Sequence, residues 1–225
     1  MPNDLESLLK EIRKCTYCAQ HLPLGPNPVV EAHQDSKILI IGQAPGTKVH
    51  ASGIPWDDAS GKRLREWMGI DLETFYDPSK IAIVPMGFCY PGKGKSGDLP
   101  PRKECAPLWH QKLLDQLSKL QLILLIGQYA QQYYLKNERK KNLTETVRSF
   151  EEYLPLYFPL VHPSPRNQIW MKKNEWFENE VVPILRSSVN TALNSDSDKT
   201  IVPDSWLKKD SYLLQKFHHF IIHFL

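Results

Sequence analysis

Four cysteines are the residues whose spacing in this 225-residue chain most directly indicates chemistry. Cys15 and Cys18 are separated by two residues, a spacing at which two thiolates can bind one metal centre. Cys89 and Cys105 flank a loop rich in glycine and proline, which can fold back and bring them together. Soft thiolates select zinc or iron–sulfur clusters, and four thiolates suit both. The spacing therefore favours one four-cysteine metal site over four unrelated buried thiols.

A second group of candidate residues follows an apolar run at residues 38–41, which is short enough for a buried strand. Residues 42–46, G-Q-A-P-G, turn the chain sharply, and Ser60 is expected to N-cap the next helix. The aromatic and acidic side chains between them are Trp56, Asp57 and Asp58. In an open parallel sheet, the loops beyond the carboxyl ends of the strands form the ligand crevice. An ordinary turn with scattered acids is the alternative.

The periodicity of apolar residues indicates the elements that must position these side chains. Strands are predicted at residues 38–41, 81–84, 122–126 and 156–161. Helices are predicted at residues 4–14, 60–69, 102–120, 128–135 and 174–186. Strands that alternate with helices predict an α/β fold, a three-layer αβα sandwich with a central four-stranded parallel sheet. The loops after the first, second and fourth strands then leave the same edge of the sheet.

Composition and charge limit the classes of protein that need to be considered. Hydrophobic residues make up 41% of the chain, and the net charge of +3 permits a polyanionic partner without requiring one. No apolar run is long enough to cross a bilayer, and the N-terminus lacks the features of a signal peptide. We therefore expect a cytoplasmic monomer with no membrane partner. We expect one domain over residues 1–188, then a polar linker and an apolar tail of unreadable role over residues 189–225.

Several motifs, taken together and in order, resemble the uracil-DNA glycosylase superfamily, and in particular its iron–sulfur members, families four and five. G-Q-A-P-G at residues 42–46 resembles the first motif of the family, and H-P-S-P at residues 162–165 resembles the second. The cysteine spacing is similar to that of the family's four-iron, four-sulfur cluster. Residues 53–61, G-I-P-W-D-D-A-S-G, are similar to the segment whose aromatic stacks on a flipped base. The resemblance spans residues 15 to about 186.

The resemblance implies an enzyme of base-excision DNA repair. Such an enzyme flips a deaminated base, uracil or a related one, out of DNA and hydrolyses its N-glycosidic bond. The base-binding positions that it implies are Gly42, Gln43, Ala44 and Trp56. Asp58 matches the carboxylate that stabilises the sugar cation and orients water. His162 matches the donor to the departing base. Both residues follow predicted strands that we expect to be neighbours, whereas Asp57 is expected to point away and support the helix start.

The same resemblance implies a cofactor and a partner. Cys15, Cys18, Cys89 and Cys105 would hold a 4Fe-4S cluster, with zinc as the alternative. DNA would be the partner, and its phosphates would be contacted by Lys93, Lys95 and Arg166.

Three positions depart from the family pattern. Gln43 replaces the acidic residue of the family-four motif, and Ala44 stands where the best-known family has its catalytic aspartate. Pro85 stands where an asparagine usually reads uracil, and proline offers neither a side-chain partner nor an N–H. Family-five members with wider base tolerance are therefore the nearer analogy.

Plainer interpretations remain open for the same residues. His162 fits an ordinary loop histidine, Trp56 fits core packing, and the two aspartates fit charges at a helix start. Two other functions also fit: a damaged-DNA binding protein that has lost catalysis, and a nucleotide-binding α/β enzyme with a zinc clasp. The second is disfavoured because the first loop lacks a phosphate-binding signature.

Overall fold

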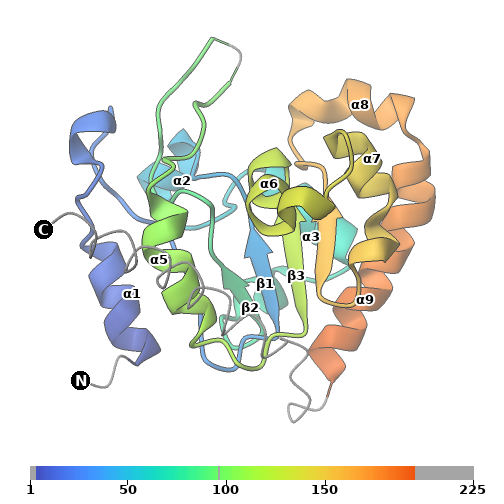
Figure 1. The fold of residues 1–225 in the computed structure, drawn as a ribbon, viewed down its shortest axis with the longest axis horizontal. Helices are drawn as coiled ribbons and strands as arrows, with labels where there is room; N and C mark the ends of the chain where they lie inside the picture. Colours follow the sequence, from blue (N-terminus) through green and yellow to red (C-terminus); the bar gives the residue numbers. More distant parts are fainter. Residues whose placement is uncertain (1–3, 96, 196–225) are drawn as a thin grey trace, which may run out of the picture.

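The computed structural model describes residues 4–95 and 97–195, which form a parallel sheet between two layers of helices (Figure 1). The strands are β1 (Ile38–Ile41), β2 (Ile81–Ile83), β3 (Leu122–Ile126) and β4 (Tyr157–Leu160). All pairings are parallel, and the order in the sheet is β2-β1-β3-β4. The predicted three-layer αβα sandwich with a four-stranded parallel sheet is therefore confirmed.

Every residue of the four strands is buried, because helices cover both faces of the sheet. This burial explains why the strands read as continuous apolar runs rather than as alternating patterns. In the register, Ile40 lies beside Ile83 on one side and beside Leu124 on the other. The carboxyl ends of all four strands consequently reach one edge, at the top of Figure 1.

The first helical layer contains α1 (Leu5–Arg13), α5 (Cys105–Leu114) and α6 (Gln128–Leu135). Leu8 and Ile12 of α1 and Trp109 of α5 join one core with Leu39 and Ile123 of the sheet. Helix α1 begins as predicted, since the Asp4 carboxylate accepts a hydrogen bond from the Ser7 N–H at 2.7 Å.

The second layer contains α3 (Ala59–Met68), α7 (Leu143–Arg148) and α9 (Val182–Asn194), the last preceded by the π-helical turn η5 (Phe177–Val181). Leu64 and Leu185 meet Ile40, Leu124 and Phe158 on the opposite face of the sheet. The sheet is thus covered on both faces, as its strand sequences require.

Several short elements were not predicted: α2 (Thr47–Ser52), α4 (Leu72–Tyr76), α8 (Gln168–Lys173), η1 (Ala19–His21), η2 (Lys136–Glu138), η3 (Phe150–Tyr153) and η4 (Pro165–Asn167). Helix α5 is also shorter than the predicted 102–120. It ends at Leu114, because Gln116 and Leu117 bond carbonyls three residues back in tight turns.

Helix α9 continues through residues predicted to form a polar linker. Val189 and Ala192 are buried in the second core. Lys37 Nζ donates to the carbonyl oxygens of Leu193 at 2.9 Å and Ser195 at 2.7 Å. The linker therefore does not begin at residue 189. Although most residues here are polar, Val189 and Ala192 give the segment a buried apolar face, and the chain stays helical to Asn194. The apolar tail predicted near the C-terminus lies outside the described residues.

The expectation that the first and fourth strands are neighbours is wrong, since β3 lies between β1 and β4. The loops after β1 and β4 meet instead across the end of β3. Within residues 4–95 and 97–195, no helix is long and apolar enough to span a membrane.

Shortening the chain tests the role of the last turns of α9. A chain that ends after residue 188 should lose at least about 2 kcal/mol of unfolding free energy relative to one that ends after residue 195, because Val189 and Ala192 leave the core. Urea unfolding of both chains and of the full-length protein measures this difference. Equal midpoints for the two shortened chains would show that the domain does end at residue 188.

Candidate active site

The turn after β1 is fastened to the segment after β2 by backbone hydrogen bonds. Gly42 O accepts from the Met86 N–H at 2.9 Å, and Gln43 O accepts from the Gly87 N–H at 3.0 Å. No hydrogen bond within residues 4–95 and 97–195 uses the N–H groups of Gln43 or Ala44. The carbonyls of this turn are thus directed toward β2, while two N–H groups remain available to a ligand.

Trp56 lies against this turn because two glycines make room for it. A Cβ on Gly42 would lie 2.9 Å from Trp56 Cζ2, and a Cβ on Gly61 would lie only 1.8 Å from the Trp56 carbonyl oxygen. Trp56 itself has a positive φ of 58°, which is unusual for a bulky residue. The indole is half-buried and packs against the second core, so core packing and pocket lining both describe it.

His162 reaches the same place from the end of β4. The Asn167 side chain donates to the His162 carbonyl at 2.8 Å, and Ser164 Oγ accepts from the Arg166 N–H at 3.2 Å to start η4. Gly127 ends β3 with φ 82°, and a Cβ there would lie 4.0 Å from His162 Cβ. The positive φ is what favours glycine at this position, since a Cβ at that distance would make only an ordinary van der Waals contact with His162. The His162 and Trp56 rings are 5.5 Å apart between centroids.

Asp58 caps helix α3, since its Oδ1 accepts from the Gly61 N–H at 2.9 Å. The predictions that Ser60 would be the N-cap and that Asp57 would support the helix start are wrong. Ser60 instead lies buried inside the first turn. Asp57 does point away as expected, because it lines a different cavity. One oxygen of Asp58 thus holds the helix, while the carboxylate also lines the pocket.

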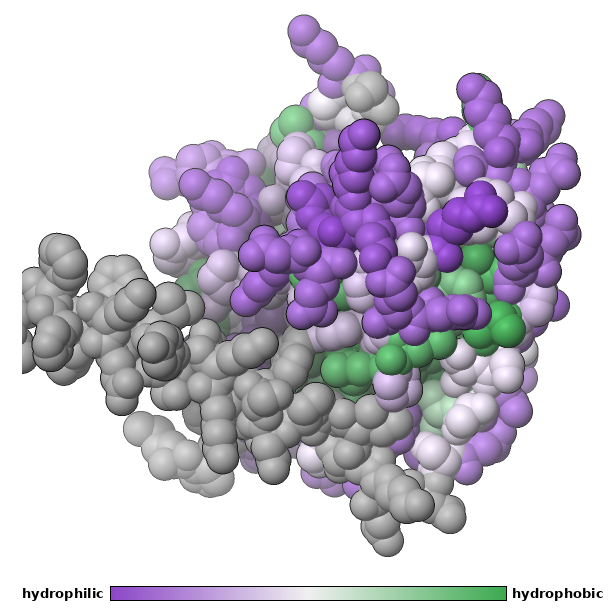
Figure 2. All heavy atoms as spheres, turned by 45° about the vertical axis from the view of Figure 1, so that its right-hand side comes forward, coloured by the Kyte–Doolittle hydropathy of each residue, from purple (hydrophilic) through white to green (hydrophobic). Residues whose placement is uncertain are grey.

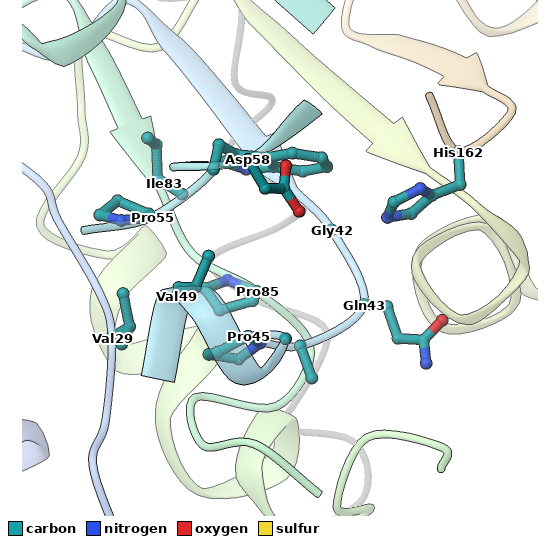
Figure 3. Close-up of a pocket in the computed structure, with 13 residues that line it drawn as sticks. Val29, Gly42, Gln43, Pro45, Val49, Pro55, Asp58, Ile83, Pro85 and His162 are labelled. Atoms are coloured by element: carbon teal, nitrogen blue, oxygen red, sulfur yellow. The ribbon is translucent and has the colours of Figure 1, made fainter. Parts of the chain in front are cut away.

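These side chains enclose a small pocket at the carboxyl edge of the sheet, with about 60 Å³ of room for the centres of water molecules (Figure 3). Figure 3 shows the Asp58 carboxylate and the His162 imidazole pointing into the space in front of Gly42, whereas the Gln43 amide points away. Gln43 Nε2 instead donates to the Leu99 carbonyl at 3.2 Å. The lining residues are Val29, Gly42, Gln43, Ala44, Pro45, Gly46, Val49, Pro55, Trp56, Asp58, Ile83, Pro85 and His162.

The predicted site residues around Gly42 are therefore brought together, and the pocket adds others that motif reasoning missed. Val29, Val49, Pro55 and Ile83 form its apolar wall. Nothing in their sequence context distinguishes them from core residues, because their only signal is hydrophobicity. Such a pocket can hold one flat ring between an aromatic side chain and a few polar groups.

Burial controls the electrostatics of His162. It lowers the pKa of the imidazole below the usual 6.5, although the nearby Asp58 carboxylate opposes the shift. His162 Nδ1 is buried and has no hydrogen-bond partner among the described residues. The ring is therefore neutral at pH 7, with one N–H donor and one acceptor, and a polar atom that lacks a partner in this structure.

The four cysteines gather beside the pocket. Cys18 and Cys89 share a small buried cluster with Leu22, and the thiol of Cys105 lies within electrostatic reach of the other three thiols. Burial raises the pKa of Cys89 to about 11 and that of Cys105 to about 12. The backbone N–H groups of Asn27 and Phe88 act against these two shifts.

The four thiols lie near one another, but they are not arranged as the ligands of a metal centre. Within the described part of the chain, no group of three or more His, Cys, Asp or Glu side chains is arranged so that it could hold a metal ion. Cys18 Sγ donates instead to Glu104 at 3.9 Å, and Glu104 pairs with Arg102 at 2.8 Å. All four cysteines are free thiols.

The predicted phosphate-contacting cations lie at the same edge of the sheet. Lys93 and Lys95 are exposed on the loop that projects beyond the sheet in Figure 1. Arg166 reaches this loop from η4, since a Cβ on Gly97 would lie 2.8 Å from its Nη1. Figure 2 shows that hydrophilic side chains cover the upper part of the molecule, the end to which the strands point.

The fold and the pocket define an α/β protein with a ring-sized site at the carboxyl edge of its sheet. A family model described as the Uracil DNA glycosylase superfamily matches residues 29–186. The chain therefore belongs to the uracil DNA glycosylase superfamily. The match includes Cys89 and Cys105 but begins after Cys15 and Cys18.

One similar solved structure is the solution NMR structure of a protein from Methanosarcina acetivorans, designated a candidate uracil DNA glycosylase. It is 17% identical in sequence, with a TM-score of 0.41, and the match covers 70% of the present chain and 93% of the other.

Alanine at Gly61 tests whether the close approach of Trp56 requires a glycine. Gly61→Ala should lower the unfolding free energy by about 2 kcal/mol or more, because its Cβ would overlap the Trp56 carbonyl oxygen. Gly46→Ala is the matched control, with its nearest atom, Asp98 Oδ2, at 3.7 Å, and should stay within about 0.5 kcal/mol of the parent. Thermal unfolding that shows equal costs for both would contradict the packing described here.

Proposed function

We propose that this protein is a DNA glycosylase that takes a deaminated base, uracil or a related base, out of DNA and hydrolyses its N-glycosidic bond. The observation that supports the proposal is the convergence of Trp56, Asp58 and His162 on one pocket beside the Gly42 turn. An extruded base is flat, carries polar edges and needs a dry cavity of its own size. The pocket supports the proposal because it places the Trp56 ring beside the polar groups of Asp58 and His162.

Base capture would use the turn and the indole together. The Trp56 ring offers a face for stacking, and the N–H groups of Gln43 and Ala44 offer donors to a base carbonyl. Pro85 and Val49 close the pocket with apolar surface. Recognition would thus depend on shape and stacking, with few polar contacts.

Hydrolysis would use Asp58 and His162 in different ways. As the bond breaks, its electrons leave with the base, and a positive charge develops on the sugar. The Asp58 carboxylate would stabilise that charge and orient a water molecule, whose oxygen bonds to the sugar carbon while its proton is released. The neutral His162 ring would donate a hydrogen bond to the base oxygen that becomes negative.

DNA would approach the carboxyl edge of the sheet. Lys93 and Lys95 lie on the loop after β2, and Arg166 reaches this loop from the segment after β4, so the three cations come together at this edge. Neutralising phosphates releases counterions, which would give most of the affinity.

The four cysteines would hold an iron–sulfur cluster, the assignment we prefer to zinc. The donor set fits, since four thiols lie near one another and the N–H groups of Asn27 and Phe88 favour two of the thiolates. A cluster here would tie the segment after α1 to the loop after β2, which is a structural contribution. Because the thiols of the described residues are not arranged as a ligand set, binding would require them to rearrange.

Damaged-DNA binding without catalysis is the second candidate. Two observations favour it: Asp58 Oδ1 is already used as a helix cap, and the Gln43 side chain is turned away toward Leu99. Excision assays separate the two functions directly.

Incision of duplexes that carry a single uracil, hypoxanthine or xanthine, followed by alkali, tests the proposal. Asp58→Asn and His162→Ala should each lower the single-turnover rate about a hundredfold or more while DNA affinity stays nearly unchanged, because each group acts in the transition state. Trp56→Ala should also weaken capture of the base.

Asp57→Asn is the matched control, since Asp57 is exposed and lines another cavity. It should retain the parental rate. Binding to damaged duplexes with no strand scission would favour the second candidate, and full activity in both Asp58→Asn and His162→Ala would exclude the proposed mechanism.

The cysteine proposal is tested by the colour and composition of the protein. Protein purified without oxygen should be brown and contain iron with acid-labile sulfide, and Cys18→Ser should lose both and unfold at lower temperature. Thr16→Ala, in the same turn, serves as the control and should keep the iron. Stoichiometric zinc without sulfide would replace the cluster by a zinc site.

A further inference from the structure

The residue that packs over the Gly42 turn has a strained backbone conformation. Pro55 and Trp56 occupy a turn before helix α3, and Trp56 has a φ of 58°. A proline followed by a residue of positive φ is the pattern of a type II turn, in which glycine is favoured after the proline because side chains are disfavoured at positive φ. Tryptophan is therefore strained at this position, and another interaction must hold the turn in this form.

The Tyr76 hydroxyl supplies such an interaction. It donates a hydrogen bond to the Pro55 carbonyl oxygen at 3.0 Å. The other polar group of the same planar peptide is the Trp56 N–H, and no hydrogen bond within residues 4–95 and 97–195 uses it. Type I and type II turns differ by a flip of this central peptide, which reverses the direction of its carbonyl. Tyr76 therefore holds the carbonyl in the direction that distinguishes the two forms.

Tyr76 acts from outside the base pocket. It is the last residue of α4, and the Arg65 guanidinium of α3 lies over its ring, 5.9 Å from the centroid. Burial raises the pKa of Tyr76 above its usual value of 10, so the hydroxyl keeps its proton at pH 7. Tyr76 and Arg65 line the neighbouring cavity, whereas Pro55 lines both that cavity and the base pocket (Figure 3). The hydroxyl thus reaches the pocket wall from behind.

The following side of Trp56 is fixed by Gly61. A Cβ on Gly61 would lie 1.8 Å from the Trp56 carbonyl oxygen, so this carbonyl is packed closely against α3. The angle φ of Trp56 relates the peptide before it to the carbonyl carbon after it, and contacts on both sides therefore determine it. If the peptide after Pro55 flips, Trp56 relaxes to a negative φ and its Cα–Cβ bond changes direction. The indole at the end of that bond then loses its close fit over Gly42.

We infer that Tyr76 is a positioning residue that keeps the Trp56 indole ready for base stacking by fixing the direction of the Pro55 carbonyl. This role rests on the proposed base-binding function. An indole already in place binds a base without a further conformational change. Without the hydroxyl, the relaxed turn becomes populated, and only the remaining fraction of the protein can stack on a base. Affinity for an extruded base then falls, while contacts with DNA phosphates are unchanged.

One substitution and a matched control separate this role from general stability. Tyr76→Phe removes the hydroxyl and keeps the ring beneath Arg65. Tyr153→Phe is the control, because the Tyr153 hydroxyl also donates to a backbone carbonyl, that of Glu138, at 3.0 Å, and Tyr153 does not line the pocket. Affinity is measured for duplexes with one 2′-fluoro-2′-deoxyuridine or 2′-fluoro-2′-deoxyinosine, which resist hydrolysis, and for the unmodified duplex. The readout is the ratio of modified to unmodified affinity, because partial unfolding lowers both equally.

We expect this ratio to fall about fivefold in Tyr76→Phe, as for one net hydrogen bond, and to stay within about twofold of the parent in Tyr153→Phe. An unchanged ratio in Tyr76→Phe, or an equal fall in both variants, would overturn the inference.

Position 56 offers a test without DNA. Glycine adopts a positive φ without strain and alanine does not, so Trp56→Gly should unfold at a higher urea concentration than Trp56→Ala while the Tyr76 hydroxyl holds the turn. When each change is combined with Tyr76→Phe, the order should reverse, because alanine is the more stable residue at a negative φ. The same advantage of glycine with and without the hydroxyl would show that Tyr76 does not determine this conformation.

The two proposals fail in different ways. A lower ratio in Tyr76→Phe, without excision of natural bases by the parent, would reject the glycosylase and keep the role of Tyr76. Excision by the parent with an unchanged ratio in Tyr76→Phe would do the reverse. A parent that binds neither modified duplex more tightly than unmodified DNA would reject both.

Discussion

The close contact of Trp56 with the Gly42 turn is the constraint on which the rest of the site depends. Its indole lies over Gly42, and its carbonyl fits only because Gly61 has no side chain. This contact fixes where helix α3 begins, and therefore where Asp58 points. The His162 ring lies 5.5 Å from the indole between centroids, so both polar groups are placed beside one packed aromatic residue.

The pocket and the cysteine region are built from the same short segments. Val29 lines the pocket and bonds through its N–H to the Phe88 carbonyl at 2.8 Å, directly before Cys89. Asn27 donates from its side chain to the His50 carbonyl of α2 at 2.7 Å. The segment at residues 27–29 thus joins the pocket wall to the residue before Cys89 and to α2 by hydrogen bonds.

The local patterns of the sequence were sufficient to predict the three layers of the fold. Continuous apolar runs identified all four strands, because a parallel sheet covered on both faces buries every strand residue. The motif at residues 42–46 and His162 were also recognisable, because each directly follows a strand, and Trp56 was recognisable within the segment bounded by Gly53 and Gly61. Sequence reasoning failed for the last turns of α9. There the two buried residues, Val189 and Ala192, are separated by polar residues, so the segment looks like a linker.

The residues alone determined the four strands, the edge of the sheet that carries the pocket and most polar members of the pocket, since strand burial and the order of elements can be recognised along the chain. The tertiary structure decided that β3 separates β1 from β4 and that His162 nevertheless lies beside Trp56. It also decided that Asp58, rather than Ser60, caps α3, and that the buried His110 ring forms a hydrogen bond with the Pro85 carbonyl. These features depend on contacts between residues far apart in the chain, whose distances and directions are set only when the layers pack.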